Sequence, residues 1–142
     1  HIFAGMTGAL KNHFGTIHNP EDFHYLNNCS PAVAEVNLAP SIRAKQRLIV
    51  GDALHVQYEG GPSYQADRVY DYWGVFAGTD PVAVASHLLL LIDPLRQQHG
   101  LPPIKETDHP CRYLEEAANR EIGTCDASQI ELIYADLAEQ AP

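Results

Sequence analysis

The longest apolar stretch of the chain, Pro81–Ile92, limits most strongly what the chain can fold into. It is too short to span a bilayer, which takes about 20 apolar residues, so it must be buried within the protein. Asp80 can cap a helix here, and a proline at the first helical position suits a helix start. We therefore expect a long, mostly buried helix that Pro94 kinks or divides and that ends at Gly100.

Shorter segments carry strand and helix patterns. Short, apolar and partly β-branched runs predict strands over Arg47–Leu54 and Asp71–Ala77, and an alternating run predicts a third over Gln129–Tyr134. A helix capped by Thr7 is expected to end near Phe14, a second is expected to start at Ser30-Pro31, and an amphipathic helix is expected over Pro110–Ile122.

Strands that alternate with helices predict an α/β domain with a small mixed or mainly parallel sheet flanked by helices. Three strands are few for such a sheet. The chain also begins at His1 and not at a methionine. We therefore expect residues 1–142 to be a single α/β domain that is an incomplete part of a larger one.

Charge and cysteine content exclude some classes of partner. Nine basic residues face 18 acidic ones, for a net charge of −9, so the chain lacks the basic stripe of a nucleic-acid binder or a membrane-surface protein. The net charge is compatible with a small anionic ligand, because backbone N–H groups can hold an anion whatever the net charge. Three cysteines, an odd number without short spacing, do not form a disulfide framework, which favours a cytoplasmic location, and an exported full-length form is the alternative. No C-x-x-C occurs, so this chain carries no iron–sulfur motif of its own.

A histidine-rich segment, residues 13–29, is a candidate for a divalent metal site. Imidazole and thiolate groups are good ligands for zinc or iron. The spacing matches no structural zinc pattern, so the alternative is a solvated loop whose histidines bond to the backbone. The candidate ligands are His13, His18 and His24, with Cys29 as a fourth.

Other polar residues are candidates for binding a small molecule. Because ligands of open α/β sheets bind beyond the carboxyl ends of strands, Asp52 is placed to act as an acid–base group or a metal ligand, unless it is only a capping residue. Gly60 and Gly61 would let the backbone approach a ligand, or form a plain turn. Lys11 can bind a carboxylate or phosphate, or it is simply an exposed helix lysine. Asp80 is a second candidate, although its position before Pro81 is more simply explained by a helix cap.

These candidate residues lie in segments that follow a known pattern. Thr7–Gly15 (TGALKNHFG) resembles the T-G-A-L-K-N-x-F-G signature of the domain-of-unknown-function family 362. The resemblance runs in order from about Gly5 to Ile133. The other segments that carry it are Ala34–Asn37, Asp52–Leu54, Gly60–Pro62 and Thr79–Val84.

The resemblance implies an α/β domain from bacteria or archaea, often joined to ferredoxin-type cluster modules, whose activity is largely unassigned. It implies that this chain is the C-terminal half to two-thirds of the family domain. The chain departs from the pattern at Ala85, where the family has an aspartate, and at Ile122–Thr124, where it has Gly-Leu-Gly.

Three hypotheses follow. In the first, the chain is a redox-associated enzyme domain that binds an anionic substrate or cofactor at the strand ends, with a cluster or flavin supplied by an N-terminal half or a partner. In the second, it is a non-catalytic metal-binding or assembly module, and in the third a fragment that completes another chain's sheet. The first assigns Lys11, Asp52 and Asp80 to catalysis in one cleft, and Asn12, Gly60 and Gly61 to the cofactor.

Overall fold

The sheet has two strands, β1 (Ile49–Gln57) and β2 (Val69–Gly78), in the computed structural model, which describes residues 1–25 and 27–136. The two strands are antiparallel, so the prediction of a mixed or mainly parallel sheet is wrong. The reason lies in the connection between them. The connection holds the turn at Gly60 and Gly61, called the glycine turn below, and the single-turn helix η3 (Ala66–Arg68). A parallel crossover needs a dozen or more residues, usually with a full helix.

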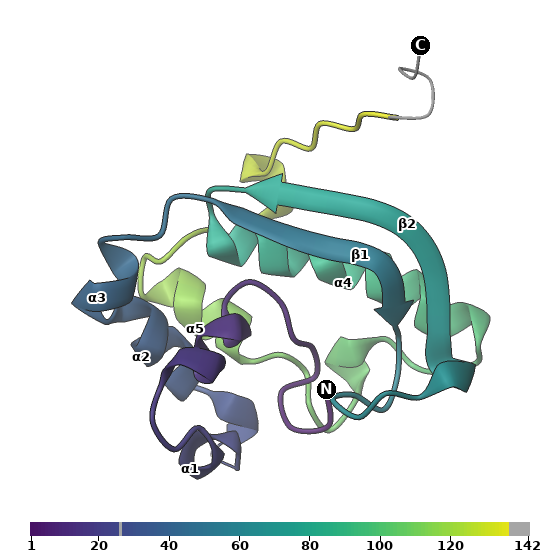
Figure 1. The fold of residues 1–142 in the computed structure, drawn as a ribbon, viewed down its shortest axis with the longest axis horizontal. Helices are drawn as coiled ribbons and strands as arrows, with labels where there is room; N and C mark the ends of the chain where they lie inside the picture. Colours follow the sequence, from purple (N-terminus) through teal and green to yellow (C-terminus); the bar gives the residue numbers. More distant parts are fainter. Residues whose placement is uncertain (26, 137–142) are drawn as a thin grey trace.

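The ladder contains a bulge near its middle. Ala53 pairs with Gly74 and His55 pairs with Asp71, so the register shifts between them. Trp73, on the bulged stretch of β2, has a φ of +59°. A bulge of this kind bends a sheet and increases its twist, and Figure 1 shows both strands strongly curved.

Helix α4 (Pro81–Gln98) confirms the strongest prediction from the sequence. Asp80 is its N-cap, Pro81 is at the first helical position, and Gly100 follows its end. Pro94 lies on the exposed side of the helix and does not divide it. Figure 1 shows α4 running along one face of the two strands. No helix among the described residues is long and apolar enough to cross a membrane.

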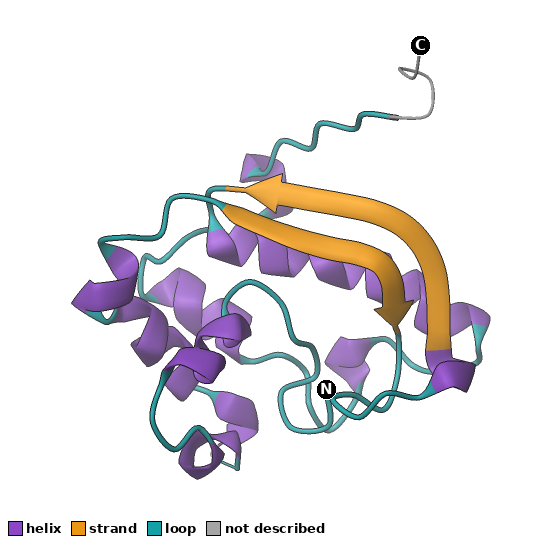
Figure 2. Cartoon of the chain, viewed as in Figure 1, coloured by secondary structure: helices purple, strands orange, loops and turns teal. Residues whose placement is uncertain are grey.

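Other helices differ from their predicted bounds. The helix predicted from Thr7 is a 3-10 helix that starts at Lys11 and has no side-chain cap. Ser30 does not cap the next helix, whose N-cap position is Pro31, and the three residues before Ser30 all have positive φ. Figure 2 shows these short helices beside the sheet. The α-helices are α1 (Glu21–His24), α2 (Ala32–Leu38), α3 (Pro40–Arg43) and α5 (Tyr113–Asn119), and the other 3-10 helices are η1 (Lys11–Thr16), η2 (Asn27–Cys29), η4 (Ile104–Glu106) and η5 (Ala127–Gln129).

The third predicted strand, Gln129–Tyr134, is not formed. Residue 129 ends helix η5, and the following residues run away from the body of the protein in Figure 1. Ile133 and Tyr134 are largely exposed. An alternating pattern becomes a strand only when a neighbouring strand pairs with it, and within residues 1–25 and 27–136 the sheet holds β1 and β2 alone.

Two apolar clusters form the core. The larger joins residues 4–14, called the N-terminal segment, to α2, α4 and α5. The smaller lies between the sheet and the end of α4. The larger cluster includes Met6, Leu10, Phe14, Val33, Val82 and Tyr113, and the smaller includes Ala53, Val56, Tyr58 and Leu95.

Candidate functional site

Lys11 is buried at the start of η1, with 6% of its surface exposed. Its Nζ atom lies 3.0 Å from Nε2 of His24 and 5.0 Å from the centre of the Phe14 ring. The other ring nitrogen of His24, Nδ1, lies 2.8 Å from the carbonyl oxygen of Pro20. Because a carbonyl only accepts, Nδ1 carries the hydrogen, and Nε2 is left to accept a hydrogen bond from the Lys11 ammonium.

Among the described residues, the Lys11 ammonium has no carboxylate partner. Within the part of the chain that the structure describes, no Asp or Glu oxygen lies within 4.0 Å of its Nζ. Burial lowers the pKa of Lys11, and the nearby Cys29 partly opposes this. Burial also raises the pKa of the Cys29 thiol. Amine and thiol are therefore both shifted toward their neutral forms.

Asn37 fixes the backbone that carries Lys11. Its Nδ2 donates hydrogen bonds to the carbonyl oxygens of Leu10, at 2.9 Å, and Val33, at 2.8 Å. The side chain is buried, and its Oδ1 has no hydrogen-bond partner among the described residues. Asn37 was not singled out as a site residue from the sequence. The sequence did hold a signal for its burial, because Asn37 is the polar residue at the end of the apolar face of α2.

Asp80 and Asp52 lie in other surroundings. Oδ1 of Asp80 accepts hydrogen bonds from the backbone of Val82 and Ala83, at 2.8 and 2.9 Å, and Oδ2 accepts one from Thr124, at 2.9 Å. Asp52 lies in the middle of β1, so its predicted place at the carboxyl end of the strand is wrong. Its Oδ1 accepts a hydrogen bond from the backbone N–H of Leu54 at 2.6 Å.

Of the three predicted catalytic residues, Asp52 lines one of the two hollows described here, and Lys11 and Asp80 line neither. Asp52 and Asn12 line a hollow of about 320 Å³ between β1, α4 and the N-terminal segment. Lys11 and Asp80 do not line this hollow. The hypothesis required all three at one rim of a parallel sheet, whereas the sheet is antiparallel and β1 continues beyond Asp52 to Gln57. Their roles in catalysis stay predictions.

Hydrogen bonds from the Gln65 side chain and from the backbone N–H of Ile2 hold the glycine turn after β1. Gly60 has a φ of +76°, and its carbonyl accepts a hydrogen bond from Nε2 of Gln65 at 3.2 Å. The carbonyl of Gly61 accepts one from Ile2 at 2.9 Å. Gly61 lines a second hollow, of about 330 Å³, together with His1. That Gly60 and Gly61 bind a cofactor stays a prediction.

The predicted metal ligands have separate partners. Nε2 of His13 lies 2.9 Å from Oε1 of Gln46, His18 is exposed, and His24 contacts Lys11. The Cys29 thiol donates to the carbonyl of His24 at 3.5 Å. Over residues 1–25 and 27–136, no group of three or more His, Cys, Asp and Glu side chains could hold a metal ion. The structure therefore does not assemble the three histidines into a site.

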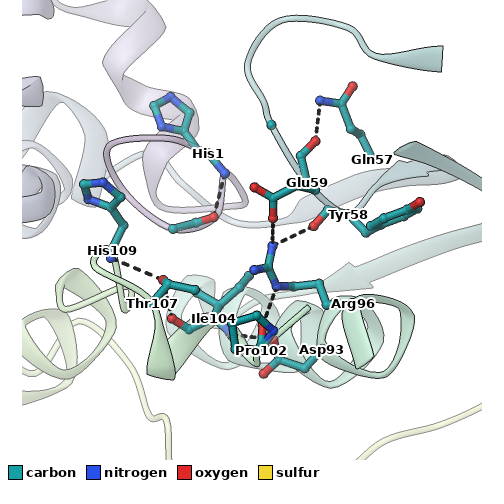
Figure 3. A network of polar contacts seen from close by, with 12 residues as sticks. His1, Gln57, Tyr58, Glu59, Asp93, Arg96, Pro102, Ile104, Thr107 and His109 are labelled. Carbon is teal, nitrogen blue, oxygen red and sulfur yellow. Dashed lines mark hydrogen bonds and ion pairs between the residues drawn. The ribbon is translucent and has the colours of Figure 1, made fainter. Parts of the chain in front are cut away.

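A buried ion pair ties α4 to the glycine turn (Figure 3). The guanidinium of Arg96 donates to the carbonyl oxygens of Tyr58, at 3.0 Å, and Pro102, at 2.8 Å, and pairs with the carboxylate of Glu59. Arg96 is 6% exposed. Removing one of these partners would leave part of the buried charge uncompensated, which is costly, so the contacts fix the turn against α4. The sequence pattern did not single out Arg96.

Comparison with known proteins places the chain in a family. The family model described as "Domain of unknown function (DUF362)" matches residues 1–87, which include Lys11, Asn37, Asp52 and Asp80. Searches of curated proteins and of solved structures each found no match. Because the matched residues make up more than half of the chain, the protein belongs to the DUF362 family.

Proposed function

We propose that this protein is part of an enzyme acting on a small anionic substrate or cofactor, with Lys11 as the residue that binds the anionic group. The observation that carries the proposal is the buried ammonium without a carboxylate partner among the described residues. Burying an unpaired charge is costly, so a lysine in such surroundings either loses its proton or meets an anion.

The contacts of Lys11 suit both of these states. Without a ligand, burial lowers the pKa of Lys11 and so shifts the group toward the neutral amine. An anion beside the nitrogen would raise this pKa again, because a negative charge stabilises the ammonium. An ammonium has three donors, and His24 accepts one of them, which leaves the others for a ligand. A lysine poised in this way can also transfer a proton during a reaction.

Several finer predictions remain part of this proposal. The resemblance suggests redox chemistry, with a cluster or flavin supplied by a partner or by an N-terminal half. That the chain is the C-terminal part of a longer family domain is likewise a prediction. Asn12, next to Lys11 in the signature, lines the hollow of about 320 Å³ and is the second residue we expect near a ligand. The alternative of a metal-binding module lacks a supporting cluster among the described residues.

The test is an NMR titration of the protein labelled at the lysine ε-carbons. The chain has three lysines, so each signal can be assigned by substitution. We expect the signal that disappears in Lys11→Ala to titrate at a lowered pKa, and this pKa to rise when inorganic phosphate or pyrophosphate is added. Lys45→Ala, which removes an exposed lysine, is the matched control. A Lys11 signal that neither titrates low nor responds to either anion would refute the proposal.

A further inference from the structure

The nitrogen of Lys11 lies among His24 and aromatic rings. Its Nζ atom is 3.0 Å from Nε2 of His24 and 5.0 Å from the centre of the Phe14 ring. The His24 ring stacks on the ring of His1, with the ring centres 5.7 Å apart, and it meets the rings of Phe3 and Phe14 edge-on. These rings hold the imidazole in place and exclude water from one side of the Lys11 nitrogen.

The hydrogen bond to His24 leaves the lone pair of a neutral Lys11 amine free. Nδ1 of His24 carries its hydrogen toward the Pro20 carbonyl, so Nε2 accepts an N–H from the amine, whose lone pair is directed elsewhere. Among the described residues, no Asp or Glu oxygen lies within 4.0 Å of Nζ to hold the group as an ammonium. A desolvated lysine of this kind is the type that attacks carbonyl carbons in enzymes.

We propose that Lys11 forms an imine with a small 2-oxo acid. This role rests on the proposed function, because the carboxylate of the 2-oxo acid is the anionic group that Lys11 would bind there. The carbonyl carbon is bonded directly to that carboxylate, so a nitrogen that meets the one also reaches the other. A protonated imine is a buried cation, and the described residues supply no carboxylate beside Nζ. A 2-oxo acid brings its own carboxylate, which favours it over a neutral ketone or aldehyde.

His24 is placed to move the protons that the condensation requires. The Nζ lone pair attacks the carbonyl carbon, a C–N bond forms, and the π electron pair of the C=O bond moves to the oxygen. Nε2 takes one hydrogen from Nζ and passes it to this oxygen, which gives a carbinolamine. Nε2 then passes the second Nζ hydrogen to the hydroxyl group, the C–O bond breaks, and water leaves. One amine and one carbonyl group thus give one imine and one water, without an oxidant or a reductant.

The experiment traps the imine in the full chain with sodium cyanoborohydride at pH 7. Because His24 is half-buried and the next residue, Tyr25, is exposed, Lys11 lies just beneath the surface, and the probes are the small 2-oxo acids glyoxylate and pyruvate. Each reduced adduct adds the mass of the 2-oxo acid less one oxygen atom, and peptide mapping by mass spectrometry locates it. We expect Lys11 to be labelled about tenfold or more faster than the exposed Lys45 and Lys105, because burial shifts Lys11 toward the nucleophilic amine.

Two matched comparisons separate this role from general lysine reactivity. Methyl pyruvate has the same ketone without the charge, so it should label Lys11 about tenfold or more slowly than pyruvate does, and the exposed lysines at least as fast. His24→Gln keeps a hydrogen-bond acceptor that cannot take up a proton, and it should slow the labelling of Lys11 by pyruvate about tenfold or more. His18→Gln, at an exposed histidine, should leave this rate unchanged.

The outcomes distinguish the imine from the proposed function. Equal labelling of the three lysines by both 2-oxo acids, or equal labelling of Lys11 by pyruvate and its methyl ester, would overturn the imine. If Lys11 responds to phosphate in the NMR titration but is not trapped, the imine is wrong and the proposed function stands. If Lys11 neither titrates low nor responds to either anion, the proposed function fails and the imine fails with it.

Discussion

The Lys11 Nζ atom lies 3.0 Å from Nε2 of His24, and the Pro20 carbonyl orients the ring from its other side. Replacing His24 with Phe keeps a ring of similar size but removes the acceptor. The ammonium then loses its hydrogen bond, so the pKa of Lys11 should fall further. The expected result is faster labelling of Lys11 by trinitrobenzenesulfonate at neutral pH. His18→Phe, at an exposed histidine, is the control, and an unchanged labelling rate in His24→Phe would show that the pair does not interact.

Asn37 is predicted to be the residue that holds Lys11 in place. Asn37→Ala removes two hydrogen bonds to the carbonyls of Leu10 and Val33, and it leaves those buried acceptors without this partner. We expect the free energy of unfolding to fall by about 2–3 kcal/mol, measured in urea. Asn119→Ala, at an exposed asparagine of α5, should change it little. A loss below about 0.5 kcal/mol would contradict the role given to Asn37.

Cys111 should make the protein less stable in alkaline solution. Burial raises the pKa of its thiol from 9.0 to about 12. The folded state therefore holds a proton that the unfolded state releases, so the stabilisation is complete below about pH 9 and is lost as the pH rises from about 9 to 12. Urea unfolding at pH 8 and pH 10.5 should show a smaller decline for Cys111→Ala than for the unchanged protein. Cys125→Ala, at an exposed cysteine, should retain the full decline.

Asp80 is predicted to act on stability through both carboxylate oxygens. Asp80→Ala removes the cap of α4 and the hydrogen bond to Thr124, and we expect a loss of about 2–3 kcal/mol in thermal or urea unfolding. Asp80→Asn keeps one acceptor oxygen and should lose less. Gly123→Ala should also destabilise the protein, because a Cβ there would overlap the Asp80 carboxylate. Equal stability of Asp80→Ala and the unchanged protein would rule out this structural role.

Local signals in the sequence were enough to predict α4. Asp80 and Pro81 define its start through contacts within a few residues, and these contacts do not depend on the rest of the fold. The two strands were predicted for the same reason. The relative direction of the two strands was predicted wrongly, because it depends on the length and structure of the segment that connects them. The place of Asp52 is a separate error, because β1 continues to Gln57 and Asp52 was expected at the carboxyl end of a strand that ends at Leu54.

The candidate site depends on contacts between distant segments. The sequence left an exposed helix lysine as the alternative for Lys11, because no residue close to it in the chain indicates that its side chain is buried. Its surroundings come from His24 on α1 and from Asn37 on α2, 13 and 26 positions further along the chain. A single sequence does not show which of many polar residues will meet. The resemblance grouped Thr7–Gly15 with Ala34–Asn37, and the hydrogen bond from Asn37 to Leu10 gives that grouping a physical basis.

Ala85 occupies the position where the resembled pattern has an aspartate, and it is fully buried beside Gly8. Ala85→Asp would place a carboxyl group against the signature segment, where even the neutral acid adds bulk and an unpaired polar group to the core. Burial would raise the pKa of the new carboxyl, so the cost should grow further as the pH rises from about 4 through the folded-state pKa. We expect urea unfolding at pH 7 to show a loss of about 3 kcal/mol or more, with Ala85→Ser losing less. Undiminished stability of Ala85→Asp at pH 7 would instead show that a positive group lies within reach of this position.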